Sequence, residues 1–291
     1  MKMAINGVTV LLLSLLLACS NGDYRITDVG IYEGTPAWEL AKAAKSQDVK
    51  KIAKIAEKSP GVLNYQDPKY KITLLYWAVG MEKYDSAEAL LKAGADPNII
   101  TPHGTALYLA AGYSFIDNQA KKDATFVRLL LEHGANPNIA GDNCETPLME
   151  SIGCGIEKTK ALVEAGADVN YRSAKGMTAA IQAMWTADGA RTTVATELEV
   201  MEYAYYLIVE KKADVTKPYL GRGSGEAIPP VIYLRNWFMK LDDKGYQRKR
   251  EVIEEFARQG VDYWSTEVPK RQFDQIKKLF PDTWEEYVKR Y

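Results

Sequence analysis

One short pattern recurs along this chain, and the recurrence constrains the fold more than any other feature. Residues 73–98 hold two short amphipathic stretches separated by a polar turn, and the second stretch ends at Gly94. Leu75 and Ala78 mark the apolar stripe of the first stretch, and Leu90 marks that of the second. Helices this short cannot bury both apolar faces against each other. Each pair therefore needs a similar pair on either side.

Copies of the closing turn are visible along the chain. GADPN at residues 94–98 is followed by GANPN at 134–138, GADVN at 166–170, KADVT at 212–216 and QGVDY at 259–263, and PGVLN at 60–64 has the same place upstream. The first three glycines of these turns are 40 and 32 residues apart, and the later turns are more widely spaced. The wider spacings indicate insertions in the later units, and residues 112–123 indicate one in the third unit.

The residues around each turn suit the predicted helix ends. Gly94, Gly134 and Gly166 follow a helix and can adopt the left-handed conformation that closes it. A threonine precedes the first helix of four units and is expected to cap its free N–H groups; these are Thr73, Thr105, Thr146 and Thr178.

Over residues 38–262 this pattern resembles the ankyrin repeat, whose consensus is G-x-T-P-L-H-x-A-A followed by L-L-x-x-G-A-D-V-N. The resemblance implies an all-α, ankyrin-type helical-repeat solenoid of about six helix-turn-helix units over residues 35–265. Residues 266–291 are predicted to be a C-terminal capping helix pair, with a partner-binding helix as the alternative. The consensus histidine is replaced by Tyr76, Tyr108 and Met149, so these units lack the imidazole that bonds the preceding loop in the family.

The N-terminus has the pattern of a secretory signal. Lys2 precedes an apolar run over residues 8–18, which is too short to span a bilayer. Residues 16–19, LLAC, resemble the lipobox of bacterial lipoproteins, which implies a signal peptide over residues 1–18 and lipidation of Cys19. The alternative is an ordinary signal peptide with an incidental cysteine. Ser20 resembles the residue of lipoproteins sorted to the outer membrane, so we expect an envelope protein anchored in the inner leaflet of that membrane and facing the periplasm.

Two polar segments near the N-terminus each have two interpretations. Residues 19–34 are expected to comprise the lipidated cysteine and a tether, and the fourteen residues 21–34 would reach roughly 45–50 Å when extended. The apolar side chains in this segment could instead pack on the first repeat. The first unit also carries a run of lysines, which we interpret as the solvated face of a terminal repeat. A basic patch for anionic lipid or nucleic acid is the alternative.

Composition and motifs argue against an enzyme. The formal net charge of −1 requires no polyanionic partner, so we expect no nucleic-acid binding. His103 and His133 are the two histidines, and no zinc, P-loop or nucleophile-elbow motif is present. We therefore expect no catalytic residues, no metal and no cofactor. Cys144 and Cys154 are predicted to lie at opposite ends of one helix over residues 146–153, too far apart for a disulfide.

Binding of another protein is the favoured function, because a solenoid presents an extended concave surface. In ankyrin proteins that surface consists of loop tips and the exposed side of each first helix. Carrying these positions over to this chain predicts partner contacts at Tyr70, His103, Tyr113, Phe115, Asn143, Met177, Trp185, Tyr219 and Trp237. We expect a monomer, anchored to the membrane through Cys19, that binds a protein partner.

Two biological roles fit such a module. One is a membrane-anchored protein–protein interaction module of the bacterial envelope, with an immunity protein that neutralises an incoming toxin as its specific form. The alternative is a structural or stress-protective envelope protein that supports a periplasmic enzyme.

Overall fold

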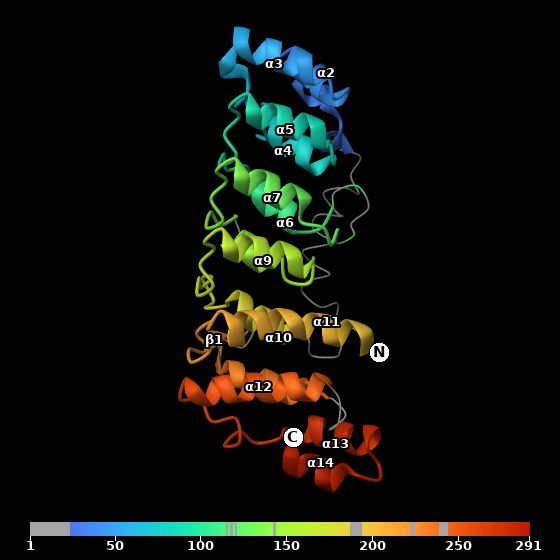
Figure 1. Ribbon diagram of the computed structural model, residues 1–291, viewed down its shortest axis with the longest axis vertical. Helices are drawn as coiled ribbons and strands as arrows, with labels where there is room; N and C mark the ends of the chain where they lie inside the picture. The colour runs from blue at the N-terminus through green and yellow to red at the C-terminus, as the bar shows by residue number, and fades with distance from the viewer. Residues whose placement is uncertain are drawn as a thin grey trace.

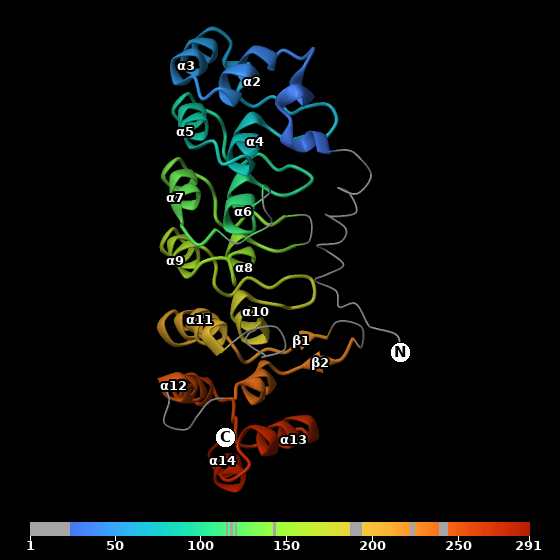
Figure 2. The ribbon, with the colours of Figure 1, turned by 90° about the vertical axis from the view of Figure 1, so that its right-hand side faces the viewer.

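The computed structural model describes residues 24–114, 116, 119, 121–141, 144–186, 194–221, 225–238 and 244–291, and these form a single stack of helix pairs (Figure 1). The first helices of successive units form one layer, and the second helices form another beside it (Figure 2). The predicted ankyrin-type helical solenoid is therefore confirmed.

The helix pairs follow each other in sequence order. They are α2 (Trp38–Lys45) with α3 (Val49–Lys58), α4 (Leu74–Gly80) with α5 (Tyr84–Lys92), α6 (Ala106–Ala111) with α7 (Thr125–Glu132), α8 (Pro147–Glu150) with α9 (Ile156–Glu164), α10 (Ala179–Thr186) with α11 (Val194–Tyr205), and the 3-10 helix η5 (Pro230–Asn236) with α12 (Lys244–Arg258). A π-helical turn, η4 (Tyr206–Glu210), extends α11. The first helices form the inner layer, and the second helices form the outer layer.

Shorter elements complete the chain. The 3-10 turns η1 (Tyr24–Thr27) and η2 (Val29–Tyr32) precede α2, and η3 (Pro60–Val62) follows α3. An antiparallel hairpin of β1 (Tyr219–Leu220) and β2 (Ala227–Ile228) precedes η5. The pair α13 (Lys270–Leu279) and α14 (Trp284–Arg290) lies at the C-terminal end of the stack, where the capping pair was predicted (Figure 1).

The threonines predicted to cap the inner helices do so. Each side-chain oxygen accepts a hydrogen bond from the N–H three residues further on: Thr73 from Tyr76 at 3.1 Å, Thr105 from Tyr108 at 3.2 Å, Thr146 from Met149 at 3.4 Å and Thr178 from Ile181 at 3.2 Å. Each bond satisfies a backbone donor that the helix itself leaves free.

One continuous core runs through the stack. The apolar residue two positions after each capping threonine is buried, at 0–1% exposure in every case: Leu75, Leu107, Leu148 and Ala180. Ala78, Ala111 and Ala183 are also at 0% exposure, and their small side chains let neighbouring helices approach closely. Every unit thus buries its apolar face against the next one.

Asparagine side chains link the turns of successive units. The Oδ1 atom of one unit's asparagine accepts a hydrogen bond from the backbone N–H of the next turn: Asn64 from Asp96 at 2.9 Å, Asn98 from Asn136 at 2.7 Å, Asn138 from Asp168 at 2.7 Å and Asn170 from Asp214 at 2.7 Å. The Nδ2 atoms of Asn98 and Asn138 also donate to the carbonyls of Gly134 and Gly166, both at 3.0 Å.

The last joint uses a different residue. Thr216 has the asparagine position, and its hydroxyl bonds Asp214 of its own turn. The link is made in the opposite direction by Gln259, whose side chain accepts from Val215 N–H and donates to the Ala213 carbonyl, both at 3.1 Å.

The N-terminal segment corrects the tether prediction for residues 26–34. Val29 and Tyr32 are 2% and 0% exposed, and the Tyr32 hydroxyl donates to the Ile72 carbonyl at 2.9 Å. The Trp77 indole N–H donates to the Thr27 carbonyl at 3.2 Å. This segment therefore packs on the first two units, which was the alternative interpretation. Cys19 and the signal peptide, residues 1–18, lie outside the described residues.

Two buried cations hold the C-terminal end together. The Arg235 guanidinium donates to the carbonyls of Tyr263, Thr266 and Tyr291 at 2.7–3.0 Å. The Lys249 ammonium is 1% exposed and donates to the Trp237 carbonyl at 3.0 Å. Burial, together with the charge of Arg235, lowers the pKa of Lys249 well below its usual value. The Arg235 bonds connect η5 to the turn before α13 and to Tyr291 after α14, and the Lys249 bond connects α12 to the residue that follows η5.

Cys144 and Cys154 are both free thiols, one exposed and one buried. The helix predicted between them is shorter than expected, because α8 spans only Pro147–Glu150. The separation of the two cysteines therefore cannot be taken from a helix over residues 146–153.

The asparagine links predict a position-dependent loss of stability. Asn138→Ala removes two side-chain bonds between units and should lower the free energy of unfolding by about 1–2 kcal/mol, measured by urea denaturation. Thr216→Ala is the matched control, because it removes one bond within a single turn and should cost about 0.5 kcal/mol or less. Equal losses in both variants would contradict a linking role for the asparagines.

Candidate partner-binding surface

The loops that connect one unit to the next form fingers beside the inner helices (Figure 2). In the finger of the third unit, Thr101 and Gly104 exchange backbone hydrogen bonds of 3.1 and 3.0 Å. In the second unit, the buried Asp67 carboxylate accepts from the N–H groups of Lys69, Tyr70 and Ile72 at 2.7–2.9 Å. The fingers are thus fixed by local hydrogen bonds, and their tips are rigid points of contact.

Two fingers use non-glycine residues in the left-handed region. Cys144 has φ 58° and Lys71 has φ 57°, at the position where Gly176 of the fifth unit has φ 76°. The family pattern has glycine there because a Cβ atom is disfavoured at positive φ. The loop nonetheless keeps its turn, since the Cys144 N–H donates to the Gly141 carbonyl at 2.9 Å.

The chain itself covers the inner helices of the first two units. Residues 24–34 lie against α2 and α4, on the side away from α3 and α5 (Figure 2). Trp77 in α4 is 4% exposed, and its indole N–H donates to the Thr27 carbonyl of this segment. Among the described residues, no segment like residues 24–34 covers the inner helices from the third unit onward. We call the fingers and inner helices of the third to sixth units the open face.

The predicted contact residues with solvent access are few. His103 is exposed at the finger tip of the third unit, and Tyr113, just after α6, is 46% exposed. Met177 and Trp185 are partly buried, and Met177 packs against the core. Tyr70 lies in the second unit, also packed against the core. Phe115 and Asn143 lie outside the described residues.

Tyr219 and Trp237 are buried, which makes them packing residues in this structure. Tyr219 is 4% exposed and stacks on Tyr233 at 5.9 Å between ring centroids. Trp237 is 1% exposed, and its indole N–H donates to the Met184 carbonyl at 3.4 Å. The prediction assumed a regular inner helix through Trp237. Instead the 3-10 helix η5 ends at Asn236, and the indole turns into the core.

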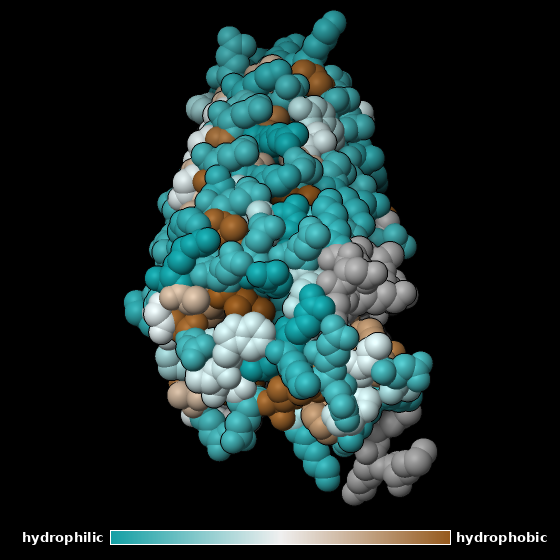
Figure 3. Space-filling model, turned by 60° about the horizontal axis from the view of Figure 1, so that its bottom comes forward, coloured by the Kyte–Doolittle hydropathy of each residue, from teal (hydrophilic) through white to brown (hydrophobic). Residues whose placement is uncertain are grey.

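Three exposed apolar side chains in the C-terminal part were missed. Leu220 in β1, Ile232 in η5 and Trp264 in the last turn are 47%, 36% and 56% exposed. Apolar and aromatic residues gather toward the C-terminal end of the molecule, which is in front in Figure 3. The structure places Gly260 where Gly94 closes the second unit, so Trp264 has the position of Asn98. The sequence alignment, which began this turn at Gln259, put Tyr263 there instead.

A polar cluster lies at the end of the inner helices of the third and fourth units. The Tyr108 hydroxyl donates to Glu150 Oε2 at 3.0 Å, and the buried Lys158 ammonium donates to the Gly112 carbonyl at 3.1 Å. Burial is the main cause that raises the pKa of Glu150, and the bond from Tyr108 opposes it. Burial also raises the pKa of the Cys154 thiol to about 12, so this thiol is protonated at neutral pH and is a poor nucleophile.

A small hollow of about 100 Å³ opens beside this cluster. Its lining includes Tyr113, Ser114 and Lys158, and its rim carries the Glu82 carboxylate, which accepts from the Ser114 hydroxyl at 2.6 Å. The insertion of the third unit is held here, because Lys121 also pairs with Glu82 at 3.7 Å. These polar groups bond one another and fix the insertion.

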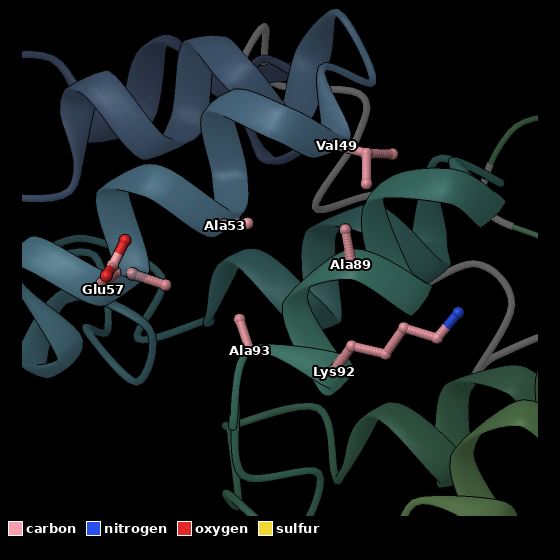
Figure 4. A pocket seen from close by; sticks show the side chains of 7 residues that line it. Val49, Ala53, Glu57, Ala89, Lys92 and Ala93 are labelled. Carbon is pink, nitrogen blue, oxygen red and sulfur yellow. The ribbon is translucent and has the colours of Figure 1, made fainter.

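A larger hollow, of about 380 Å³, lies on the outer face between α3 and α5. Figure 4 shows its lining, which consists of Val49, Ala53, Ala56 and Glu57 from α3 and Ala89, Lys92 and Ala93 from α5 or just after it. Most of these side chains are aliphatic. Glu57 and Lys92 are the charged residues of this lining.

In the part of the chain that the structure describes, no three His, Cys, Asp or Glu side chains are grouped in a way that could hold a metal ion. Among the described helices, none has the length and apolar character needed to cross a bilayer.

A comparison with protein families identifies the repeats. The family model for ankyrin repeats, three copies, matches residues 75–173. Residues 75–173 are ankyrin repeats. The crystal structure of the ankyrin repeat protein EF0377 superposes with a TM-score of 0.52 and 22% identity, over 74% of this chain and 96% of that one, which shows the shared fold.

Three curated proteins align over part of the chain. They are an ankyrin repeat-containing protein of Treponema pallidum (37% identity, 36% of this chain, 32% of that protein), Protein PhlB of Serratia liquefaciens (36% identity, 37% and 45%) and XBAT35 of Arabidopsis thaliana, named as an E3 ubiquitin-protein ligase (35% identity, 30% and 18%). The matches span less than half the length of each relative. Ankyrin repeats indicate a protein-interaction module.

The raised pKa of Glu150 predicts a pH-dependent effect of its removal. The folded chain binds this proton more tightly than the unfolded chain, so ionisation of Glu150 destabilises the fold as pH rises above about 4.3. Glu150→Gln removes that cost. The variant's free energy of unfolding minus that of the wild type should therefore be larger at about pH 7 than at about pH 4, as measured by urea denaturation of both proteins at both pH values. A difference that stays constant or falls would contradict the assignment.

Proposed function

We propose that this chain is a lipid-anchored interaction module of the bacterial envelope that binds a protein partner on its open face. The observation that carries the proposal is an ankyrin stack whose inner-helix side is covered by residues 24–34 over two units, while no such segment among the described residues covers the remaining four. Solenoids bind through such extended surfaces.

The exposed side chains suit protein recognition. Ile232 on the inner 3-10 helix and Leu220 in the finger hairpin of the sixth unit offer apolar contact area, and His103 offers a polar group at the third finger. Trp264 adds a large exposed aromatic ring in the last turn. Apolar and aromatic anchors beside polar groups are typical of the residues that dominate protein–protein affinity.

The lipid anchor is the second part of the proposal. It is supported by the lipobox-like LLAC at residues 16–19 and by the short apolar run before it. Only four residues lie between Cys19 and Tyr24, where the described chain begins, so the two Cα atoms are at most about 18 Å apart. An anchor at Cys19 would therefore hold the first units close to the lipid surface, with the open face further along the stack. Ser20 favours the outer membrane and the periplasm.

A specific form of the module is an immunity protein that neutralises a toxin. Its partner would then be a toxin delivered by a competing bacterium, and loss of the protein would leave cells sensitive to their sister cells. Normal survival in such co-culture, with envelope defects in pure culture, would instead favour a supporting role in the envelope.

A matched pair of variants tests the open face. The double variant Leu220→Ser with Ile232→Ser removes exposed apolar contacts from the sixth unit and should weaken capture of the partner from a periplasmic extract by about tenfold or more. Val49→Ser with Leu279→Ser is the control, because these residues are 46% and 50% exposed on the outer helix α3 and on the cap. Equal capture by both variants would refute the assignment of the surface.

The anchor has its own test. Cys19→Ala should abolish incorporation of radiolabelled palmitate and should move the protein from the membrane fraction to the soluble periplasmic fraction, because no lipid can attach. Persistent labelling of this variant would exclude Cys19 as the lipidated residue.

A further inference from the structure

The first helix pair presents a face of lysines to solvent. Six lysines of α2 and α3 are exposed: Lys42, Lys45, Lys50, Lys51, Lys54 and Lys58. Lys50, Lys54 and Lys58 are four residues apart and so lie in one row along α3. The buried residues of that helix, Ile52 and Ala56, are on its other side. We call the six side chains the lysine face.

Few carboxylates neutralise the lysine face. The first unit contains three, and Glu39 pairs with Lys42 and, at 3.6 Å, with Lys51. Asp48 caps α3 by accepting from the Lys51 backbone N–H at 3.0 Å. Within the described residues, no ion pair forms to the other four lysines, namely Lys45, Lys50, Lys54 and Lys58. The first unit therefore has a net positive charge, although the whole chain has a formal charge of −1.

The other end of the stack differs in this respect. The cap, residues 266–291, carries six lysines and arginines against five carboxylates, so its charges nearly balance. Several of its cations are engaged: Arg290 pairs with Glu286 at 3.3 Å, and Lys277 lies over the Trp284 ring at 4.3 Å. The excess of free positive charge is therefore a feature of the first unit and not of both ends.

The lysine face belongs to one of the two units against which the described chain begins. Residues 24–34 pack beside α2 and α4, so a lipid attached at Cys19 would lie within about 18 Å of this segment. Charges at a surface interact over a Debye length, about 8–10 Å at physiological salt. An anchor at Cys19 would lie near the first two units, because residues 24–27 contact α4 and residues 29–32 contact α2. Of these two units, the first carries the lysine face.

We propose that the lysine face docks the first unit on an anionic membrane surface, as a second and electrostatic contact beside the lipid anchor. The orientation rests on the proposed anchor, but the affinity of the lysines for anionic lipid does not. Docking at this end directs the later units and their open face away from the bilayer. The lysines thus set the orientation of the stack, and the partner-binding surface stays accessible.

Vesicle binding by unlipidated protein tests this directly. The chain without residues 1–19 keeps every buried side chain described, the first of which is Val29. It should co-sediment with vesicles of phosphatidylglycerol and phosphatidylethanolamine in equal amounts, and not with vesicles of phosphatidylcholine. Binding should weaken as sodium chloride is added, because salt screens the attraction.

Charge-removing variants locate the contact. Replacing Lys45, Lys50, Lys54 and Lys58 by glutamine should weaken binding to the anionic vesicles by about a hundredfold or more, at roughly fivefold for each lysine. The matched control replaces four exposed cations of the cap by glutamine: Lys270, Arg271, Lys278 and Lys289. It should bind as the wild type does. Unchanged thermal unfolding of both variants would show that they are folded.

Three results would overturn the proposal. They are equal binding to anionic and neutral vesicles, wild-type affinity of the lysine-face variant, and an equal loss in the cap variant. None of them depends on palmitate labelling at Cys19, so failure of lipid docking and failure of the proposed anchor are distinguishable.

Discussion

Each helix pair in this chain is too short to bury its own apolar surface, and the rest of the structure depends on contact between neighbouring pairs. Two kinds of interaction provide that contact. Leu75, Leu107 and Leu148 form one continuous core along the inner helices. Outside that core, Asn98 and Asn138 each join one turn to the next through two side-chain hydrogen bonds. Each unit is therefore stabilised by its neighbours. The first and last units lack a neighbour on one side, so other parts of the chain must cover their apolar surface.

The two ends are closed in different ways, and this decides where a partner can bind. At the N-terminal end, residues 24–34 cover the concave side of α2 and α4. At the C-terminal end, the buried Arg235 guanidinium fastens the last turn and α14 through backbone carbonyls. The surface left for recognition begins at the third unit and extends to the exposed Leu220 and Ile232 of the sixth.

The repeat architecture and its caps could be predicted from sequence because they rest on local chemistry. Threonine caps, glycine turns and apolar spacing are each visible within a few residues, and the caps at Thr73 and Thr105 form as expected. The candidate site was less predictable. Burial of Trp237 depends on where η5 ends, and coverage of Trp77 depends on a distant segment, so neither is encoded in the repeat pattern. Exposure of Trp264 follows from the lack of a further repeat beyond it.

Circular dichroism of one excised helix pair, residues 66–98, tests the central claim most directly. The account predicts a largely unfolded peptide without a cooperative thermal transition, because its apolar faces lose the neighbours on both sides, while the chain from residue 24 to 291 unfolds cooperatively. A helical peptide with a cooperative transition would contradict the dependence of each unit on the next.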